Sequence, residues 1–286
     1  MHQETELLVK AIDGLRQDPN YFKDYIFPIA SAFFTSILGA AIAYFTLKHQ
    51  EKIQIEKEKM DTANKWTLLM EEARAALISI KGNYYKDLSD HPLKRVATIP
   101  SILFHASPVE ESFEKLSFII PKAEDRKKDY PKWSQISRIR SMVNNYNYLL
   151  QLWQQRNQIE RPIKEQLMAK FPHQSYVDIS YEEAVAAIGP ANMSVLVDLT
   201  ERVIKLTDDI IIELDNFLCE FPKYAKTRID TKRLKQYGSV LIYSNNGNEL
   251  LIEILKRTPA PNLKEVEALF GEPADEIEKR LVTGYE

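Results

Sequence analysis

The stretch that decides the fold is IASAFFTSILGAAIAYF, residues 29–45, which contains no charged side chain. The uncharged run around it extends from Ile26 to Leu47. As an α-helix this run is about 33 Å long, against roughly 30 Å of hydrocarbon in a bilayer. An α-helix also satisfies its own backbone hydrogen bonds, so it tolerates lipid. The run therefore predicts a single transmembrane helix at residues 25–47, surrounded by membrane lipid.

Two other interpretations of the run stay open. A secretory signal peptide is one, because Ala41 and Ala43 resemble a small-residue cleavage site, although the leader is rich in acidic residues. A buried core helix of a soluble protein is the other. Aromatic side chains at both ends favour the span, because they are enriched at membrane–water interfaces. They are Tyr21, Phe22, Tyr25 and Phe27 at one end, and Tyr44 and Phe45 at the other.

Basic residues close to the run set the expected orientation. Fewer precede it than follow it, Arg16 and Lys23 against Lys48, Lys52, Lys57 and Lys59. Loops rich in lysine and arginine stay on the cytoplasmic side. We therefore expect a single-pass protein of the cytoplasmic (inner) membrane, oriented N-out and C-in, in which residues 1–24 form a short extracytoplasmic tail.

Small residues recur at a spacing of four within the run. They are Ala32, Ser36 and Ala40, together with Gly39 and Ala43. This spacing lets two transmembrane helices approach closely, so it indicates a homo-oligomeric span. Chance occurrence in an alanine-rich segment is the alternative. No ionisable residue lies inside the run, so one such helix offers no ion pathway.

The remainder of the chain has the composition of a cytosolic helical body. The net charge of −3 argues against a general nucleic-acid binder. The single cysteine, Cys219, excludes an intramolecular disulfide and fits a reducing compartment. We expect a stalk and first bundle helix at residues 48–86, with the stalk either solvated or part of an oligomeric coiled coil, and a helical bundle at residues 87–225. Residues 226–286 are expected to form a small C-terminal subdomain.

Apolar residues on alternating three- and four-residue steps predict two further long helices in this body. One carries Ile136, Ile139, Val143, Tyr146, Leu150 and Trp153, and the other Leu196, Leu199, Val203, Leu206, Ile210 and Phe217. Capping boxes predict two more helix starts, one at Ser107–Glu110 and one at Ser180–Glu183. Asp209 and Glu213 lie one turn apart, a spacing at which two carboxylates could share a cation. The interpretation that we favour is a solvated helix face.

The C-terminal part changes character at GSVLIYSNNGNELLIEIL, residues 238–255. Two apolar runs around Asn-Asn-Gly predict a β-hairpin, with a helix over residues 248–257 as the alternative. Asn262 and Gly271 predict the start and end of a short helix. The expected fold class is therefore mainly α: one N-terminal transmembrane helix plus a cytosolic helical bundle with a small α+β C-terminal appendage.

Residue patterns that carry chemistry are absent from the sequence. The glycines are scattered, so no phosphate-binding loop is expected, and the histidines do not occur at metal-ligand spacing. Cys219 lies in an apolar helix and is interpreted as a packed thiol. We therefore assign no catalytic residue, metal or cofactor, and favour a role that is not enzymatic.

One stretch, WQQRNQIERP at residues 153–162, breaks an apolar stripe with polar side chains. Asn157 and Glu160 occupy positions where the helical period calls for apolar residues, and Arg156 and Arg161 flank them. Such a break indicates a buried polar network, a register lock or an interaction site. The local alternative is that Pro162 bends or restarts the helix, which turns a different face inward.

The same stretch resembles part of the active motif of the HEPN ribonuclease family. These are helical bundles in which an arginine, a polar residue and a histidine four to six positions on act at a paired-helix interface on RNA phosphate. Arg156 and Asn157 match the beginning of that motif, and Arg161 stands where the histidine belongs. The resemblance implies an RNA-cleaving bundle, in a degenerate form that lacks its acid/base group.

Three functions follow as hypotheses. The first is a membrane-anchored protein whose cytosolic helical domain is a protein-interaction or assembly module with an unidentified cytosolic partner. The second is a membrane-perturbing effector of a bacterial defence or toxin system, suggested by a sensor-like body joined to a small-residue span. The third is the HEPN-like ribonuclease. Nucleic acid is not an expected partner of the first two.

Overall fold

The computed structural model describes residues 2–15, 21–121, 130–170, 180–234, 236–245 and 248–285. Within these ranges the protein is mainly helical and contains no β-strand. The longer helices are α1 (His2–Leu15), α2 (Phe27–Gly82), α4 (Ile136–Lys170) and α6 (Pro190–Thr227). The shorter ones are α3 (Pro92–Thr98), α5 (Tyr181–Ile188), α7 (Glu249–Ile254), α8 (Leu263–Phe270) and α9 (Ala274–Arg280).

The chain divides into two compact units, residues 1–55 and 56–286, which we call the N-terminal unit and the helical unit. The N-terminal unit holds α1 and the apolar part of α2. One π-helical turn, Phe22–Ile26, leads directly into α2. Pro28 has no N–H for the α-helical ladder, and at this point the Phe27 N–H donates to the Phe22 carbonyl instead.

One helix of the described chain is long and apolar enough to cross a membrane, and it contains the uncharged run. None of the residues in its most apolar window is buried. Phe33, Phe34 and Leu38 are among the large apolar side chains that are exposed there. These apolar side chains are therefore uncovered in the described part of the chain.

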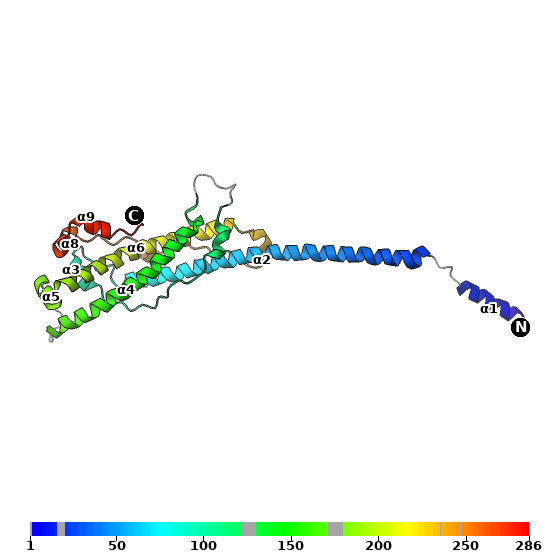
Figure 1. Cartoon of the computed structure of the whole chain (residues 1–286), viewed down its shortest axis with the longest axis horizontal. Helices are drawn as coiled ribbons and strands as arrows, with labels where there is room; N and C mark the ends of the chain where they lie inside the picture. Colours follow the sequence, from blue (N-terminus) through cyan, green and yellow to red (C-terminus); the bar gives the residue numbers. More distant parts are fainter. Residues whose placement is uncertain are drawn as a thin grey trace. The chain divides into compact units, whose positions relative to one another are not determined.

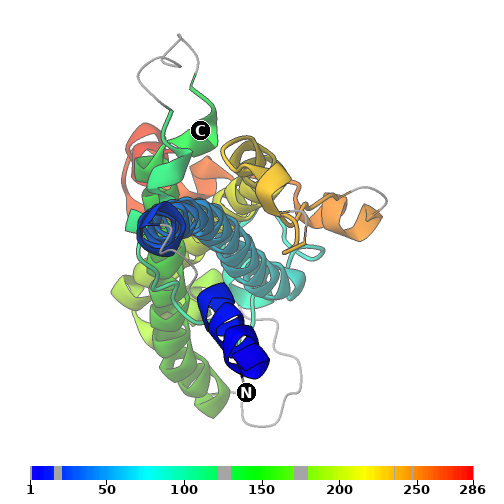
Figure 2. The same cartoon turned by 90° about the vertical axis from the view of Figure 1, so that its right-hand side faces the viewer.

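The helical unit is built on three long helices, which run lengthwise beside one another in Figure 1 and are seen from one end in Figure 2. Helix α4 packs along α6. The second half of α2 reaches α6 through the Arg74–Asp215 ion pair, and Tyr84, just after the end of α2, packs against Trp153 of α4. The apolar stripe predicted for α6 is confirmed throughout, and the stripe predicted for α4 is confirmed from its second residue onward. Their buried members include Ile139, Val143, Trp153, Leu196, Val203, Ile210 and Phe217.

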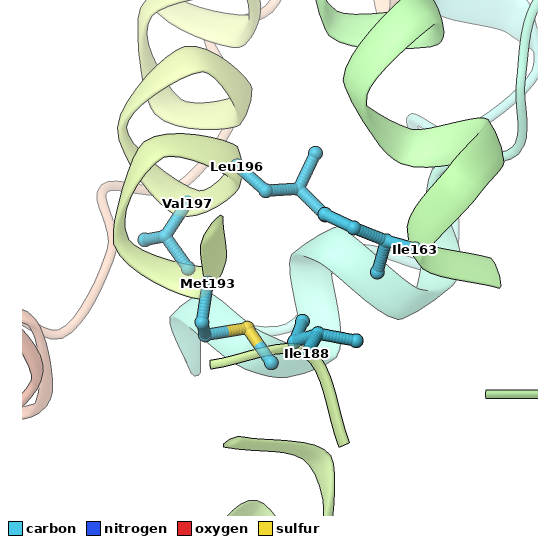
Figure 3. Close-up of a cluster of buried hydrophobic side chains, with 5 residues drawn as sticks. All are labelled: Ile163, Ile188, Met193, Leu196 and Val197. Atoms are coloured by element: carbon cyan, nitrogen blue, oxygen red, sulfur yellow. The ribbon is translucent and has the colours of Figure 1, made fainter. Parts of the chain in front are cut away.

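A second apolar cluster closes one end of the bundle. Figure 3 shows Ile163 of α4 and Ile188 of α5 meeting Met193, Leu196 and Val197 of α6. The predicted Ser180 capping box is confirmed: its hydroxyl accepts from the Glu183 N–H, and the Glu183 carboxylate accepts from the Ser180 N–H. Gly189, at φ +85°, provides the turn from α5 into α6.

The predicted β-hairpin is wrong, and the alternative helix is confirmed. Asn248 caps α7 by accepting from the Leu251 N–H, so the second apolar run is helical. The first run forms no strand, because its backbone groups form hydrogen bonds with a side chain of α2. The Asn64 amide donates to the Ser239 carbonyl over 3.1 Å and accepts from the Leu241 N–H over 2.8 Å. Asn246 and Gly247, the centre of the predicted turn, lie outside the described residues.

The helix predicted to start at Ser107 is also wrong. Residues 107–112 are not helical, and only a short 3₁₀ segment, Glu114–Ile119, follows. The Asn147 side chain of α4 accepts from the Val109 N–H over 2.8 Å and donates to its carbonyl over 3.1 Å. This long-range pairing satisfies the backbone in an open conformation. The predicted helix between Asn262 and Gly271 is confirmed as α8, with Gly271 in the left-handed conformation.

Candidate functional site: buried charges around α6

The polar break in α4 is a buried ion pair. The side chains of Arg156 and Glu160 are 0% and 1% exposed, and their atoms approach to 3.1 Å. Arg156 also donates to Thr200 of α6 over 3.0 Å and to the Ile99 carbonyl over 3.1 Å. Helix α4 continues through Pro162 without a restart, so the buried face is not reset there. The break is thus a network that joins α4 to α6 and to the end of α3.

The neighbouring polar residues have different surroundings. Asn157 is half-buried and donates to the Ile102 carbonyl over 2.8 Å. Arg161 is exposed on the other side of α4 and pairs with Glu165. The structure therefore brings Arg156, Asn157 and Glu160 together over the segment that follows α3, and leaves Arg161 apart from them.

The surroundings of Arg156 decide whether it could act on RNA as the matching arginine of the ribonuclease motif does. Nε, Nη1 and Nη2 of Arg156 all donate to groups of the same chain, and the residue has no exposed surface. Burial lowers the pKa of Arg156, and the neighbouring Glu160 carboxylate offsets that effect. In this conformation Arg156 presents no donor to an external phosphate, so its observed role is structural.

Helix α6 carries a row of acidic side chains, two of which were predicted to lie on a solvated face. Asp209 and Glu213 are in fact buried. Each buried acid of α6 meets a cation from a different element. The pairs are Glu201 with Arg95, Asp208 with Lys81, Asp209 with Arg257, and Glu213 with both Lys132 and Arg138. Half-buried Asp215 pairs with Arg74 in the same way.

Several of these charged side chains also form hydrogen bonds with the backbone of the segment between α7 and α8. The Lys81 ammonium donates to the Lys256 carbonyl over 2.6 Å, and Arg95 donates to the Pro259 carbonyl over 2.8 Å. Asp208 accepts from the Thr258 N–H over 2.5 Å. Hydrogen bonds to buried charges therefore tie the segment between α7 and α8 to the bundle. Among the described residues no three metal-binding side chains converge, so the row of acids holds no evident metal site.

A cavity of about 300 Å³ lies where this segment crosses α6. Its lining includes Arg95, Glu201 and Asp208 at a charged end, and Pro259 and Leu281 at an apolar end. Burial raises the pKa of the Glu201 carboxyl to about 7 even though Arg95 lies 2.9 Å away and opposes the shift. The charged end thus contains an acid that changes protonation near neutral pH.

The raised pKa of Glu201 predicts a pH-dependent stability. Between its ordinary value of 4.5 and about 7, the folded state binds a proton that the unfolded state has released. The contribution of Glu201 to stability is therefore full below pH 4.5 and falls as the pH rises to 7, by on the order of 3 kcal/mol. Glu201→Gln should lack this fall. Urea unfolding at pH 5 and pH 8 measures it, and an identical pH dependence in both proteins would contradict the assignment.

The span residues singled out by the sequence all lie on the apolar part of α2. At 100° per residue, Ala32, Ser36, Gly39, Ala40 and Ala43 fall within an arc of about 100° on one side of the helix. All five are exposed. A Cβ added at Gly39 would meet nothing within 4 Å, so the packing of this chain does not require glycine there.

Comparisons with known protein families, with curated proteins and with solved structures gave no match. Cys219 is half-buried, and burial raises the pKa of its thiol, with Asp215 adding to the effect. A thiol shifted in this direction is a poor nucleophile at neutral pH.

Proposed function

We propose that the chain is a single-pass membrane protein whose helical unit is a cytosolic interaction and assembly module. The observation that carries the proposal is the uncovered apolar run at residues 26–47 of an otherwise polar chain. Burying a single leucine or phenylalanine side chain stabilises a protein by about 1.5–3 kcal/mol. Leaving Phe33, Phe34 and Leu38 in water is therefore costly, and a bilayer of matching thickness removes that cost.

The orientation that we propose is N-out and C-in. Lys48 and Lys52 follow the run immediately, and Lys48 lies over the ring of Tyr44 at 5.6 Å from its centroid. Basic side chains next to an aromatic residue suit the cytoplasmic interface. The helical unit would then be in the cytosol, where a lone cysteine stays reduced.

Assembly through the small-residue stripe is the second part of the proposal. Gly39 and its neighbours leave room for the backbone of an identical helix, because small side chains at this spacing permit close approach. The uncharged interior of the run argues against pore formation by one helix. A membrane-perturbing effector, the alternative, would have to open the bilayer as an oligomer.

The stripe predicts that Ala40→Leu weakens self-association in vesicles at least tenfold, because the larger side chain holds the two backbones apart. Ala41→Leu is the matched control, since Ala41 faces the opposite side of the same helix. Energy transfer between donor- and acceptor-labelled full-length protein measures the effect. Equal self-association of both variants and the parent protein would show that the small residues do not form the contact.

Dye leakage from the same vesicles separates the two functions. An anchor and assembly module leaves the vesicles sealed at every protein density at which energy transfer reports oligomers. Leakage that rises with oligomer formation and is lost in Ala40→Leu would support the membrane-perturbing effector and contradict the assembly role.

A further inference from the structure

The first helix, α1, has an apolar face that no part of the described chain covers. Leu7, Leu8 and Ile12 are 68%, 63% and 54% exposed, and Ala11 between them is exposed as well. These residues recur at one- and four-residue steps, which places them on one side of the helix. A helix of this kind is stable when its apolar side meets a second phase, either protein or lipid.

The opposite face of α1 is polar. At 100° per residue Glu6, Lys10 and Asp13 fall together, on the side away from Leu7 and Ala11. Glu4, in the first turn, falls on the same side as Leu7 and Ala11, so the helix is amphipathic from its second turn onward. It is too short and too charged to cross a bilayer itself. An amphipathic helix of low overall hydrophobicity is suited to lie in the plane of a membrane interface.

Chain length keeps α1 close to the proposed span. From Leu15 to Ile26 the chain advances eleven residues, which reach at most about 40 Å when fully extended. Tyr21, Phe22 and Tyr25 lie within this interval and are exposed, at the end of the run where the interface is expected. Binding of α1 to that interface is therefore intramolecular, so a weak intrinsic affinity is sufficient.

The charge of α1 selects the kind of lipid. Glu4, Glu6 and Asp13 outweigh Lys10, so the helix is acidic at neutral pH. Anionic headgroups would repel it, whereas zwitterionic headgroups would not. An acidic helix therefore fits a neutral lipid surface, and its binding depends on apolar contact rather than on attraction to charge.

We propose that α1 is an interfacial helix, which lies on the neutral lipid surface at the N-terminal end of the span with Leu7, Leu8, Ala11 and Ile12 in the acyl boundary. The proposal rests on the membrane anchoring of residues 26–47. It adds a second membrane contact that fixes the N-terminal end at the bilayer surface. Deletion of that contact would leave the anchor itself in place.

The test uses single-cysteine versions of the full-length protein in phosphatidylcholine vesicles. Cys219→Ala removes the native thiol, and an environment-sensitive fluorophore is attached at Leu8→Cys, Asp13→Cys or Leu38→Cys. Asp13 is the matched control on the polar face of α1, and Leu38 reports the middle of the span. Spin-labelled lipids quench at a shallow or a deep position, and iodide quenches from the water.

The expected result is a blue-shifted Leu8 probe, quenched more by the shallow than by the deep lipid label, with iodide quenching at least threefold weaker than at Asp13. The Leu38 probe should be quenched most by the deep label. Anionic lipid in the vesicles should reduce the lipid quenching at Leu8.

Three outcomes would overturn the proposal, and they differ from one another. Equal iodide quenching at Leu8 and Asp13, with Leu38 still quenched by the deep label, places α1 in water and leaves the anchor intact. A Leu8 probe that is shielded from iodide but insensitive to lipid labels means that protein covers the helix. A Leu38 probe that no lipid label quenches removes the anchor, and the interfacial helix with it.

Discussion

Arg156→Ala is expected to destabilise the helical unit by about 3 kcal/mol, because it leaves the Glu160 carboxylate in the core with the partly exposed Lys164 ammonium, 2.7 Å away, as its remaining counter-charge. The loss extends beyond the ion pair. Thr200 of α6 and the carbonyls of Ile99 and Pro100 also lose the donor that they accept from. Unfilled volume at a site with no exposed surface adds to the cost.

Urea unfolding followed by tryptophan fluorescence measures this effect. Trp66, Trp133 and Trp153 are all buried, so their emission reports the helical unit. Arg161→Ala is the matched control: it removes an arginine five residues away on the same helix, exposed and paired only with Glu165. That change should alter the free energy of unfolding by less than about 1 kcal/mol.

Two further variants separate a structural network from a catalytic one. Arg156→Lys keeps the charge but not the forked set of donors, so it should lie between the parent and Arg156→Ala in stability. Arg156→Met combined with Glu160→Leu removes both charges and should regain part of the lost stability. If Arg156→Ala were as stable as the parent while an RNA-cleaving activity disappeared, the arginine would be catalytic and the structural assignment wrong.

Two arginines in the middle of the apolar run should abolish membrane insertion. A charged side chain at the centre of a transmembrane helix costs about 2.5–3.5 kcal/mol, so Ile37→Arg with Leu38→Arg costs about 5–7 kcal/mol. The matched control is Ile53→Arg with Ile55→Arg, which lies on the same helix beyond the uncharged run. Separation of membrane and soluble fractions should show the first variant soluble or degraded and the second still bound. Equal membrane binding of the two variants would contradict the span.

The long elements were predictable from sequence because their signals are local. The uncharged run fixes the apolar half of α2, and the three- and four-residue steps fix α4 and α6. Caps at Ser180 and Asn262 fix two short helices, since a cap depends on residues within one turn. These elements recur in the structure with bounds close to those expected.

The predictions that failed depend on contacts between distant residues. Asn64 pairs with the backbone of residues 239–241, and Asn147 pairs with Val109, so each asparagine replaces the partner strand or helical turn that local pattern implied. No pattern within one turn or one strand contains this information. The acids of α6 were misread for a different reason. Asp209 and Glu213 were predicted to face solvent because they are charged, but the buried face of α6 is wider than its apolar stripe and includes both.

The polar break of α4 was predictable in part, because its position follows from local pattern but the identity of its inward side chains does not. The sequence predicted a polar break in the apolar stripe of α4, with a buried polar network as one interpretation. It selected Asn157 rather than Arg156 as the inward position, because extrapolating the stripe beyond Trp153 is uncertain by one residue. The structure turns Arg156 and Glu160 inward, four residues apart, which is the spacing that lets them pair along one helix face.

The central claim is that lipid surrounds residues 26–47, and alkaline carbonate extraction followed by density flotation of the full-length protein tests it most directly. The account predicts that the protein floats with the lipid after extraction and that its mass is that of the uncleaved chain. Recovery of the protein in the aqueous fraction, or a mature chain that begins near Tyr44, would contradict it.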